Sequence, residues 1–172
     1  MESHALHGDG LYYESSDTLW VNLFVPSTAQ LSMLAGVSVK MDTGFPDGDD
    51  ATITFTAEKP KEFTLAVRRP SWAGDGFTMK VNGESVTVPP LASLRAGGAG
   101  GRGNGMDDAP VQPSSYVEVK RAWKTGDTVQ LTLPKSLRLE PTPDNRAVAA
   151  IMWGPLALAG DLVVAHVYRM HD

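Results

Sequence analysis

The stretch ATITFTAEKPKEFTLAVRR, residues 51–69, decides the fold class, because it contains two runs in which apolar and polar side chains alternate. In the first run Ile53 and Phe55 are separated by threonines, and in the second Leu65 and Val67 alternate with other residues. Successive side chains of a strand point to opposite faces, so each run has one face for a core. We therefore predict two neighbouring strands that each bury one face.

The same period of two recurs further along the chain. Val129 and Leu131 alternate with threonine and glutamine. Asn82-Gly83 precedes another run, residues 86–88, and Asn-Gly favours a tight hairpin because both residues tolerate positive φ. Short strands separated by turn residues are typical of two packed sheets. We predict an all-β fold, an antiparallel β-sandwich of jelly-roll type with a long Gly-rich loop.

One predicted strand, residues 19–25, is expected to be apolar on both faces. Trp20 and Phe24 lie on one face with Asn22 between them, and the aliphatic residues alternate with them on the other. A strand that is apolar on both faces is usually covered on both faces. The second cover is either the chain's own loops or a partner domain.

The composition excludes several function classes. The chain has 172 residues and a net charge of −5, which argues against the basic face of a nucleic-acid-binding protein. It has no cysteine, so disulfides, thiolate metal sites and cysteine nucleophiles are absent. The sequence contains no run of 18 apolar residues, so it predicts no membrane-spanning helix. These features leave the cellular compartment undecided.

Acidic residues cluster at one predicted turn, Asp47, Asp49 and Asp50. Calcium takes several carboxylate and carbonyl oxygens, but the spacing lacks the distal glutamate of a calcium loop. A solvated acidic turn is the favoured interpretation. Glycosidic cleavage needs two suitably spaced carboxyl groups or their equivalent, and no such pair is evident in the sequence.

No other motif assigns chemistry to the chain. The histidines lack further ligands close in sequence, and those near the C-terminus are expected to be exposed: His4, His7, His166 and His171. Fingerprints of phosphate loops, dinucleotide sites and serine hydrolases are missing. We assign no catalytic residue, no metal ligand and no cofactor.

Three tryptophans, Trp72, Trp123 and Trp153, admit two interpretations. Their rings can stack on the C–H faces of a sugar or pack inside the protein, and packing is favoured because aromatic side chains dominate cores. The candidate sugar-contact or domain-interface residues are therefore Trp20, Phe24, Trp72 and Trp123.

Several segments together resemble the β-L-arabinofuranosidase-like enzymes of glycoside hydrolase family 127. They cover most of residues 9–160 and are, in order, LYY (11–13), LWVNLFVPS (19–27), FTLAVRRPSWA (63–73), VNG (81–83), the run from Tyr116 through RAWKTGDTVQLTLP (121–134), and GPL (154–156). None is specific alone, but their order and spacing are.

The resemblance implies a division of the chain. In that family an N-terminal α/α barrel carries catalysis and β-sandwich domains follow it. Residues 1–10 are then the remnant of the catalytic domain, residues 11–160 the accessory sandwich and residues 161–172 a tail. Residues 92–114, rich in glycine, form an insertion that is expected to be flexible.

The resemblance also implies that the family's catalytic residues are missing. Its nucleophile is a cysteine held near a zinc site, and no cysteine is present in this chain. Glu2 and His4 would at most edge the active site of the longer protein. We expect a non-catalytic accessory domain that is inactive alone, with the barrel as its partner and carbohydrate as a further candidate partner. A stand-alone carbohydrate-binding module and a protein-interaction sandwich are the alternatives.

Overall fold

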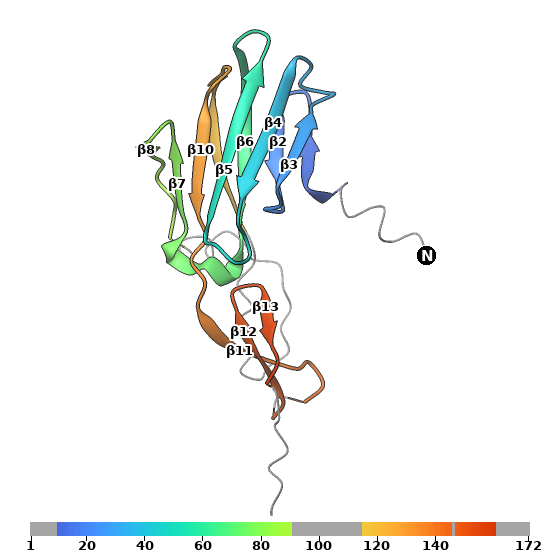
Figure 1. The fold of residues 1–172 in the computed structure, drawn as a ribbon, viewed down its shortest axis with the longest axis vertical. Helices are drawn as coiled ribbons and strands as arrows, with labels where there is room; N and C mark the ends of the chain where they lie inside the picture. The colour runs from blue at the N-terminus through green and yellow to red at the C-terminus, as the bar shows by residue number, and fades with distance from the viewer. Residues whose placement is uncertain (1–9, 91–114, 146, 161–172) are drawn as a thin grey trace, which may run out of the picture. The chain divides into compact units, whose positions relative to one another are not determined.

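The computed structural model describes residues 10–90, 115–145 and 147–160 of the chain. The chain divides into two compact units, residues 1–135 and residues 136–172. The first unit contains a four-stranded and a six-stranded sheet, and the second contains a three-stranded sheet (Figure 1). The expectations for residues 1–9, 91–114 and 161–172 lie outside the described residues.

The four-stranded sheet has two long antiparallel strands at its centre and edge. Its order is β1 (Tyr12–Glu14), β2 (Thr18–Val21), β6 (Lys61–Arg69), β9 (Ser115–Trp123). Strands β6 and β9 pair over nine residues, from Lys61 opposite Trp123 to Arg69 opposite Ser115. The β2–β6 pair is parallel, whereas the other two pairs are antiparallel.

The six-stranded sheet is antiparallel throughout. Its order is β3 (Ser27–Gln30), β4 (Val37–Thr43), β5 (Asp50–Ala57), β10 (Thr128–Thr132), β7 (Thr78–Val81), β8 (Glu84–Ser85). Burial alternates along β5 and β10, as the period of two predicts. The predicted all-β sandwich is confirmed.

The core lies between these two sheets. Ile53 and Phe55 of β5 and Leu65 of β6 have no exposed surface. The indole of Trp123 packs against the rings of Phe55 and Phe63, with centroid distances of 4.6 and 5.8 Å. Its Nε1 donates to the Phe63 carbonyl at 3.1 Å, so the one polar atom of this buried side chain is satisfied.

The Asn-Gly hairpin forms, but its second strand is shorter than predicted. Asn82 and Gly83 have φ values of 52° and 87°, the left-handed conformation that this turn requires. Strand β8 is Glu84–Ser85, so the predicted strand at residues 86–88 is wrong. One backbone bond, from Val86 N to the Met79 carbonyl at 2.9 Å, follows the strand.

The predicted strand over residues 19–25 also ends early. Strand β2 stops at Val21, and the alternation of faces stops with it. Phe24 is 5% exposed and belongs to the core, while Leu23 and Val25 are 40% and 46% exposed. Trp20 points to the opposite side of β2 from the core, so the prediction that it shares a face with Phe24 is corrected.

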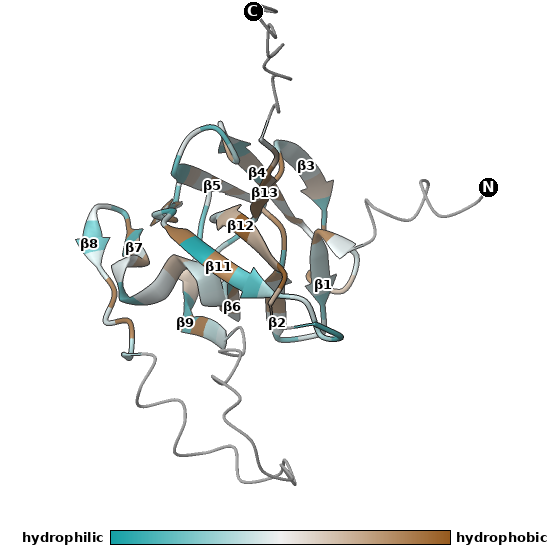
Figure 2. Cartoon of the chain, turned by 90° about the horizontal axis from the view of Figure 1, so that it is seen from below, coloured by the Kyte–Doolittle hydropathy of each residue, from teal (hydrophilic) through white to brown (hydrophobic). Residues whose placement is uncertain are grey.

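The second unit carries a small antiparallel sheet of order β11 (Leu137–Pro141), β12 (Ala149–Trp153), β13 (Leu156–Leu158). Strands β12 and β13 are largely apolar (Figure 2). The sequence suggested one accessory domain over residues 11–160, and the boundary between the two compact units falls within that range, after residue 135.

Candidate functional site

Aromatic side chains gather on the outer face of the four-stranded sheet. Tyr13 lies opposite Trp20 in the β1–β2 pair, and Trp20 is the partner of Ala66 in the β2–β6 pair. Tyr13 is 58% exposed and Trp20 is half-buried. Ala66 has no exposed surface although it points away from the core, so its neighbours cover it. We call Tyr13, Trp20 and Tyr116 the outer aromatic face.

Tyr116 completes this face and is held in place by a hydrogen bond. It lies on β9 opposite Arg68 of β6, and its ring is 43% exposed. Its hydroxyl donates to Oδ1 of Asn22, which follows β2 and is nearly buried. The bond joins the two strands that flank β6 and so fixes the tyrosine ring across the sheet.

Sequence reasoning found Trp20 but missed Tyr13 and Tyr116. Both tyrosines occupy positions on strands whose neighbours face the core: Tyr12 packs against the core, and Val117 is buried. A signal was therefore present, since Tyr116 precedes Val117 in an alternating run. Tyrosine is amphipathic, so its presence alone does not indicate which face it takes.

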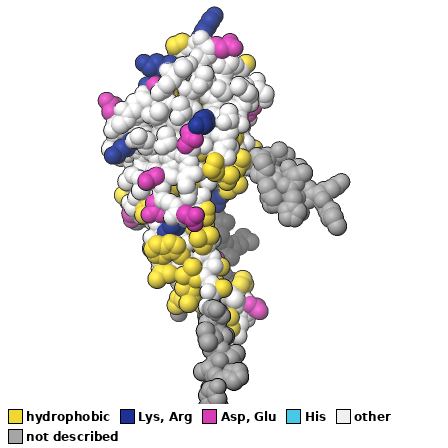
Figure 3. All heavy atoms as spheres, viewed as in Figure 1, with side chains coloured by type: hydrophobic (Ala, Val, Ile, Leu, Met, Phe, Trp, Pro, Cys, Tyr) yellow, Lys and Arg dark blue, Asp and Glu magenta, His cyan; other side chains and the backbone are white. Residues whose placement is uncertain are grey.

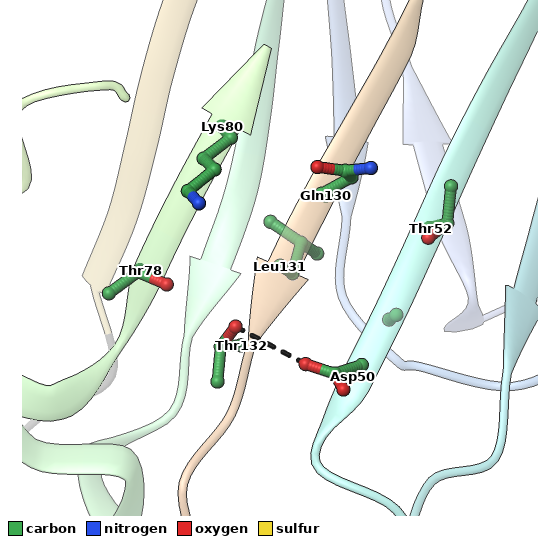
Figure 4. Close-up of a pocket in the computed structure, with 8 residues that line it drawn as sticks. Asp50, Thr52, Thr78, Lys80, Gln130, Leu131 and Thr132 are labelled. Carbon is green, nitrogen blue, oxygen red and sulfur yellow. Dashed lines mark hydrogen bonds between the residues drawn. The ribbon is translucent and has the colours of Figure 1, made fainter. Parts of the chain in front are cut away.

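The outer face of the six-stranded sheet is polar, and charged side chains are scattered over it (Figure 3). Strands β5, β10 and β7 form a shallow groove there of about 330 Å³. Its side chains form two rows across the three strands (Figure 4): Thr52, Gln130 and Lys80 in one row, and Asp50, Thr132 and Thr78 in the next.

The groove offers hydroxyl, amide, ammonium and carboxylate groups but no aromatic ring. The Thr132 hydroxyl donates to Oδ1 of Asp50 at 3.3 Å, so part of its polar capacity is used within the groove. Sugar sites in proteins usually combine such polar groups with an apolar platform. The groove is therefore typical of the solvated face of a sheet.

The acidic turn at residues 47–50 holds a lysine. Nζ of Lys135 donates to the Gly48 carbonyl at 2.9 Å and forms an ion pair with Oδ1 of Asp49. The lysine side chain is only 4% exposed. An ammonium group thus takes the oxygen ligands that a calcium ion would need. Among the described residues, no group of three or more His, Cys, Asp or Glu is placed to hold a metal.

Two of the predicted contact tryptophans lie in packed surroundings. Trp123 has no exposed surface, so in this structure it is a core residue. Trp72 lies in the 3-10 segment η2 (Ser71–Gly76) and stacks on Phe45, with centroids 5.6 Å apart and ring planes 12° apart. Phe45 also meets Phe24 edge to face at 6.2 Å. Phe24, like Trp123, packs inside the sandwich.

Buried Arg69 fixes the position of η2, which sequence reasoning did not anticipate. Its guanidinium donates to the Gly74 carbonyl from Nη2 at 2.6 Å and to the Pro89 carbonyl from Nη1 at 2.6 Å. It also pairs with Asp75 at 2.8 Å. The side chain is 1% exposed, and these partners satisfy its donors. The residue supports the end of the sandwich rather than a reaction.

Two carboxylates titrate below their ordinary range. Burial raises the pKa of Glu14, but bonds from the Ser32 hydroxyl and from the amides of residues 32–34 outweigh it and lower that pKa. The hydroxyls of Ser15 and Thr18 lower the pKa of Asp17. Both groups therefore stay ionised near neutral pH, whereas a general acid for glycoside cleavage needs a raised pKa.

The first comparison is with protein families. The family described as Beta-L-arabinofuranosidase, GH127 middle domain, matches residues 18–135. This chain belongs to the GH127 middle-domain family. The matched range ends where the first compact unit ends, so the family corresponds to the two-sheet sandwich. The resemblance seen in the sequence is confirmed.

Solved structures agree with this assignment. A GH127 β-L-arabinofuranosidase from Geobacillus stearothermophilus T6 is 28% identical with a TM-score of 0.65, covering 87% of this chain and 21% of that chain. A chain described as a glycoside hydrolase is 22% identical (TM-score 0.64; 86% and 22% covered). The GH127 β-arabinofuranosidase BT3674 is 20% identical (TM-score 0.60; 86% and 23% covered).

The GH127 middle domain described here spans about a fifth of the length of these solved chains. The last two likenesses, at 22% and 20% identity, show the fold alone. A search of curated proteins found no match. Within the described residues, no helix is long and apolar enough to cross a membrane.

Proposed function

We propose that this chain is the non-catalytic β-sandwich domain of a GH127 β-L-arabinofuranosidase-like enzyme, in which it supports a catalytic α/α-barrel domain. The observation that carries the proposal is the family match over residues 18–135 in a chain that spans about a fifth of a GH127 enzyme. A domain of that length forms only a part of such an enzyme. We assign to this part the role of supporting the catalytic domain.

The inventory of chemical groups supports a non-catalytic role. The chain has no cysteine, whereas the resemblance implies a cysteine nucleophile in this family. Cleavage also needs a proton donor for the leaving oxygen. The carboxylates with a shifted pKa, Glu14 and Asp17, are both shifted downward, which favours the ionised form and not the donor.

The outer aromatic face is the surface that we assign to the catalytic domain of the same polypeptide. Aromatic residues are enriched at the centres of protein interfaces, and Tyr13, Trp20 and Tyr116 share this outer face with the charged residues Arg68 and Glu118. The opposite sheet presents threonine, lysine and glutamine instead. Tyr13 and Tyr116 are both exposed, and the Tyr116–Asn22 bond fixes one of them before any partner binds. A preformed aromatic surface binds at a lower entropic cost.

The alternative of a stand-alone carbohydrate-binding module fits less well. Such a module needs aromatic rings that are open to the sugar. Trp123 is enclosed in the core, and one face of the partly buried Trp72 ring is stacked on Phe45. The second alternative, a protein-interaction sandwich, shares the prediction of an aromatic contact face and differs in its partner.

The first test is an assay on the chain itself with a chromogenic β-L-arabinofuranoside. We expect no release of arabinose above the buffer rate, because the chain has no cysteine and no pair of nucleophile and proton donor is found among the described residues. Turnover that is abolished by one Asp or Glu substitution would show a carboxylate mechanism and overturn the proposal.

The second test concerns the contact face. Tyr13→Ser combined with Trp20→Ser should raise the solubility limit of the isolated chain, because both changes remove apolar surface from an outer face. The matched control is Thr52→Ser with Thr54→Ser on the outer face of the six-stranded sheet, which should leave solubility unchanged. Unfolding of the aromatic double variant would place these residues in the core and remove the contact assignment.

A further inference from the structure

The asparagine of the Asn-Gly hairpin is bonded to the turn that faces it. Nδ2 of Asn82 donates to Oδ1 of Asp127 at 2.9 Å, and Oδ1 of Asn82 accepts a bond from the Thr128 amide at 2.8 Å. The backbone amide of Asn82 donates to the Thr128 carbonyl at 2.9 Å. Asn82 is an exposed residue, yet both polar atoms of its side chain are engaged with the start of β10.

Asp127 needs a hydrogen-bond donor at residue 82. It is one of the buried polar residues, with 2% of its surface exposed. Its Oδ2 accepts a bond from the Lys124 amide at 3.0 Å, and the guanidinium of Arg121 lies 3.7 Å from the same oxygen. Its Oδ1 takes the Asn82 donor. A carboxylate at residue 82 would place two negative charges at hydrogen-bond distance in a poorly hydrated place, which is costly.

An asparagine followed by glycine can convert itself into such a carboxylate. Glycine has no Cβ, so its backbone nitrogen approaches the preceding side chain without hindrance. The Gly83 nitrogen attacks Cγ of Asn82, the side-chain nitrogen leaves as ammonia, and a cyclic imide forms. Water then opens the ring to aspartate or to isoaspartate. The net reaction consumes one water and releases one ammonia, without an oxidant or a reductant.

We propose that Asn82 is a deamidation site which the folded state protects, and that deamidation in the unfolded state hinders the return to the native fold. In the folded chain, Cγ reaches the Gly83 nitrogen only after both side-chain bonds to the facing turn break. The hairpin also holds Asn82 and Gly83 at φ values of 52° and 87°. Neither restraint exists in the unfolded chain.

Both products conflict with the native hairpin. Aspartate turns a carboxylate toward Oδ1 of Asp127, where the native side chain donates. Isoaspartate lengthens the main chain within a turn that connects directly opposed residues, Val81 and Glu84. The modification therefore records how long the chain has been unfolded. This inference concerns the lifetime of the sandwich and does not depend on the role assigned to it.

The first experiment follows deamidation of the full 172-residue chain at neutral pH by peptide mapping with mass spectrometry. Asn82 should react at least tenfold more slowly in the folded chain than in a free peptide of residues 79–86 in the same buffer, because the folded site must first open. In urea that unfolds the chain, Asn82 should react as fast as Asn104, which is also followed by glycine. A rate in the folded chain equal to that of the peptide overturns the proposal.

The second experiment tests the clash with Asp127 by urea unfolding. Asn82→Asp should lower the urea midpoint, and Asp127→Asn should lower it as well, because two amide donors then face each other. The double variant exchanges donor and acceptor, keeps the bonds to the Lys124 and Thr128 amides, and should recover most of the midpoint. The matched control Ser85→Asp adds the same charge to exposed β8 and should leave the midpoint unchanged. Losses that simply add in the double variant overturn the proposal, and so does an Asn82→Asp chain as stable as the unmodified one.

Discussion

Trp123 and Trp153 occupy similar places in two sheets and differ in what covers them. Each is the last residue of its strand and lies on the apolar face, β9 for the first and β12 for the second. Trp123 has no exposed surface, because the six-stranded sheet supplies Phe55 against it. Trp153 is 37% exposed.

The contrast teaches that an apolar strand face becomes a core only when a second layer meets it. In the first unit the two sheets bury each other's inner faces and form one cluster of buried residues. The three-stranded sheet has the same kind of face, and the described residues of the second unit contain no second sheet to pack against it. The cluster of buried apolar residues lies in the sandwich, so we expect most of the stability of the chain to reside there.

The largest expected effect tests this difference between the two tryptophans directly. Trp123→Ala should lower the free energy of unfolding by about 3–5 kcal/mol, because it leaves a cavity and removes the bond to the Phe63 carbonyl. Trp153→Ala should change it by less than about 1 kcal/mol, since the side chain is partly exposed. Urea unfolding followed by circular dichroism at submicromolar concentration measures both. Equal losses of unfolding free energy would mean that the sandwich and the three-stranded sheet unfold as one cooperative unit.

A smaller expected effect tests whether hydrogen bonds from a buried side chain also stabilise the sandwich. Arg69→Met should cost about 2–3 kcal/mol, because the Gly74 and Pro89 carbonyls lose their donor while Asp75, mostly exposed, remains hydrated. The control Lys120→Met removes an exposed pair with Glu62 and should cost less than about 0.5 kcal/mol. The difference in urea midpoint is the measurement. A loss for Arg69→Met no larger than the control would make the buried guanidinium dispensable.

The sandwich was predictable from sequence where alternation and turn chemistry agree. Residues 51–57 and 63–67 alternate, and they form the centres of β5 and β6. Asn82 and Gly83 adopt the positive φ that their types favour. In these places the local preference and the global fold coincide, so one residue pattern is sufficient.

The rest depended on long-range contacts. Phe24 continues the alternation of β2 in the sequence, yet the strand ends at Val21 and Phe24 turns to Phe45 in the core. No local pattern specifies that end. The outer aromatic face depends on Tyr116 meeting Asn22 across β6, a pair 94 residues apart in sequence. In the sequence, the apolar face of the three-stranded sheet shows the same pattern of apolar residues as a buried strand face.

The smallest expected effect concerns a hydrogen-bonded tie between the layers of the sandwich. Glu14 lies in β1 of the four-stranded sheet, and its carboxylate accepts bonds from the Ser32 amide at 2.8 Å and the Met33 amide at 3.0 Å, between β3 and β4. These bonds hold the pKa of Glu14 below its ordinary value although burial opposes them. Because the folded state prefers the ionised form, the tie stabilises the fold above the unfolded pKa of about 4.3.

The tie should therefore be lost as the pH falls through the lowered folded pKa of Glu14. Glu14→Gln should cost roughly 1 kcal/mol at pH 7, a modest value because the carboxylate is largely solvated, and the difference from the unmodified chain should shrink below about pH 4. The control Glu84→Gln, in exposed β8, should shift stability by less than about 0.5 kcal/mol at either pH. Thermal unfolding between pH 3 and 7 measures the difference. A Glu14→Gln penalty that persists undiminished at pH 3 would show that shape, and not charge, joins the two layers at this edge.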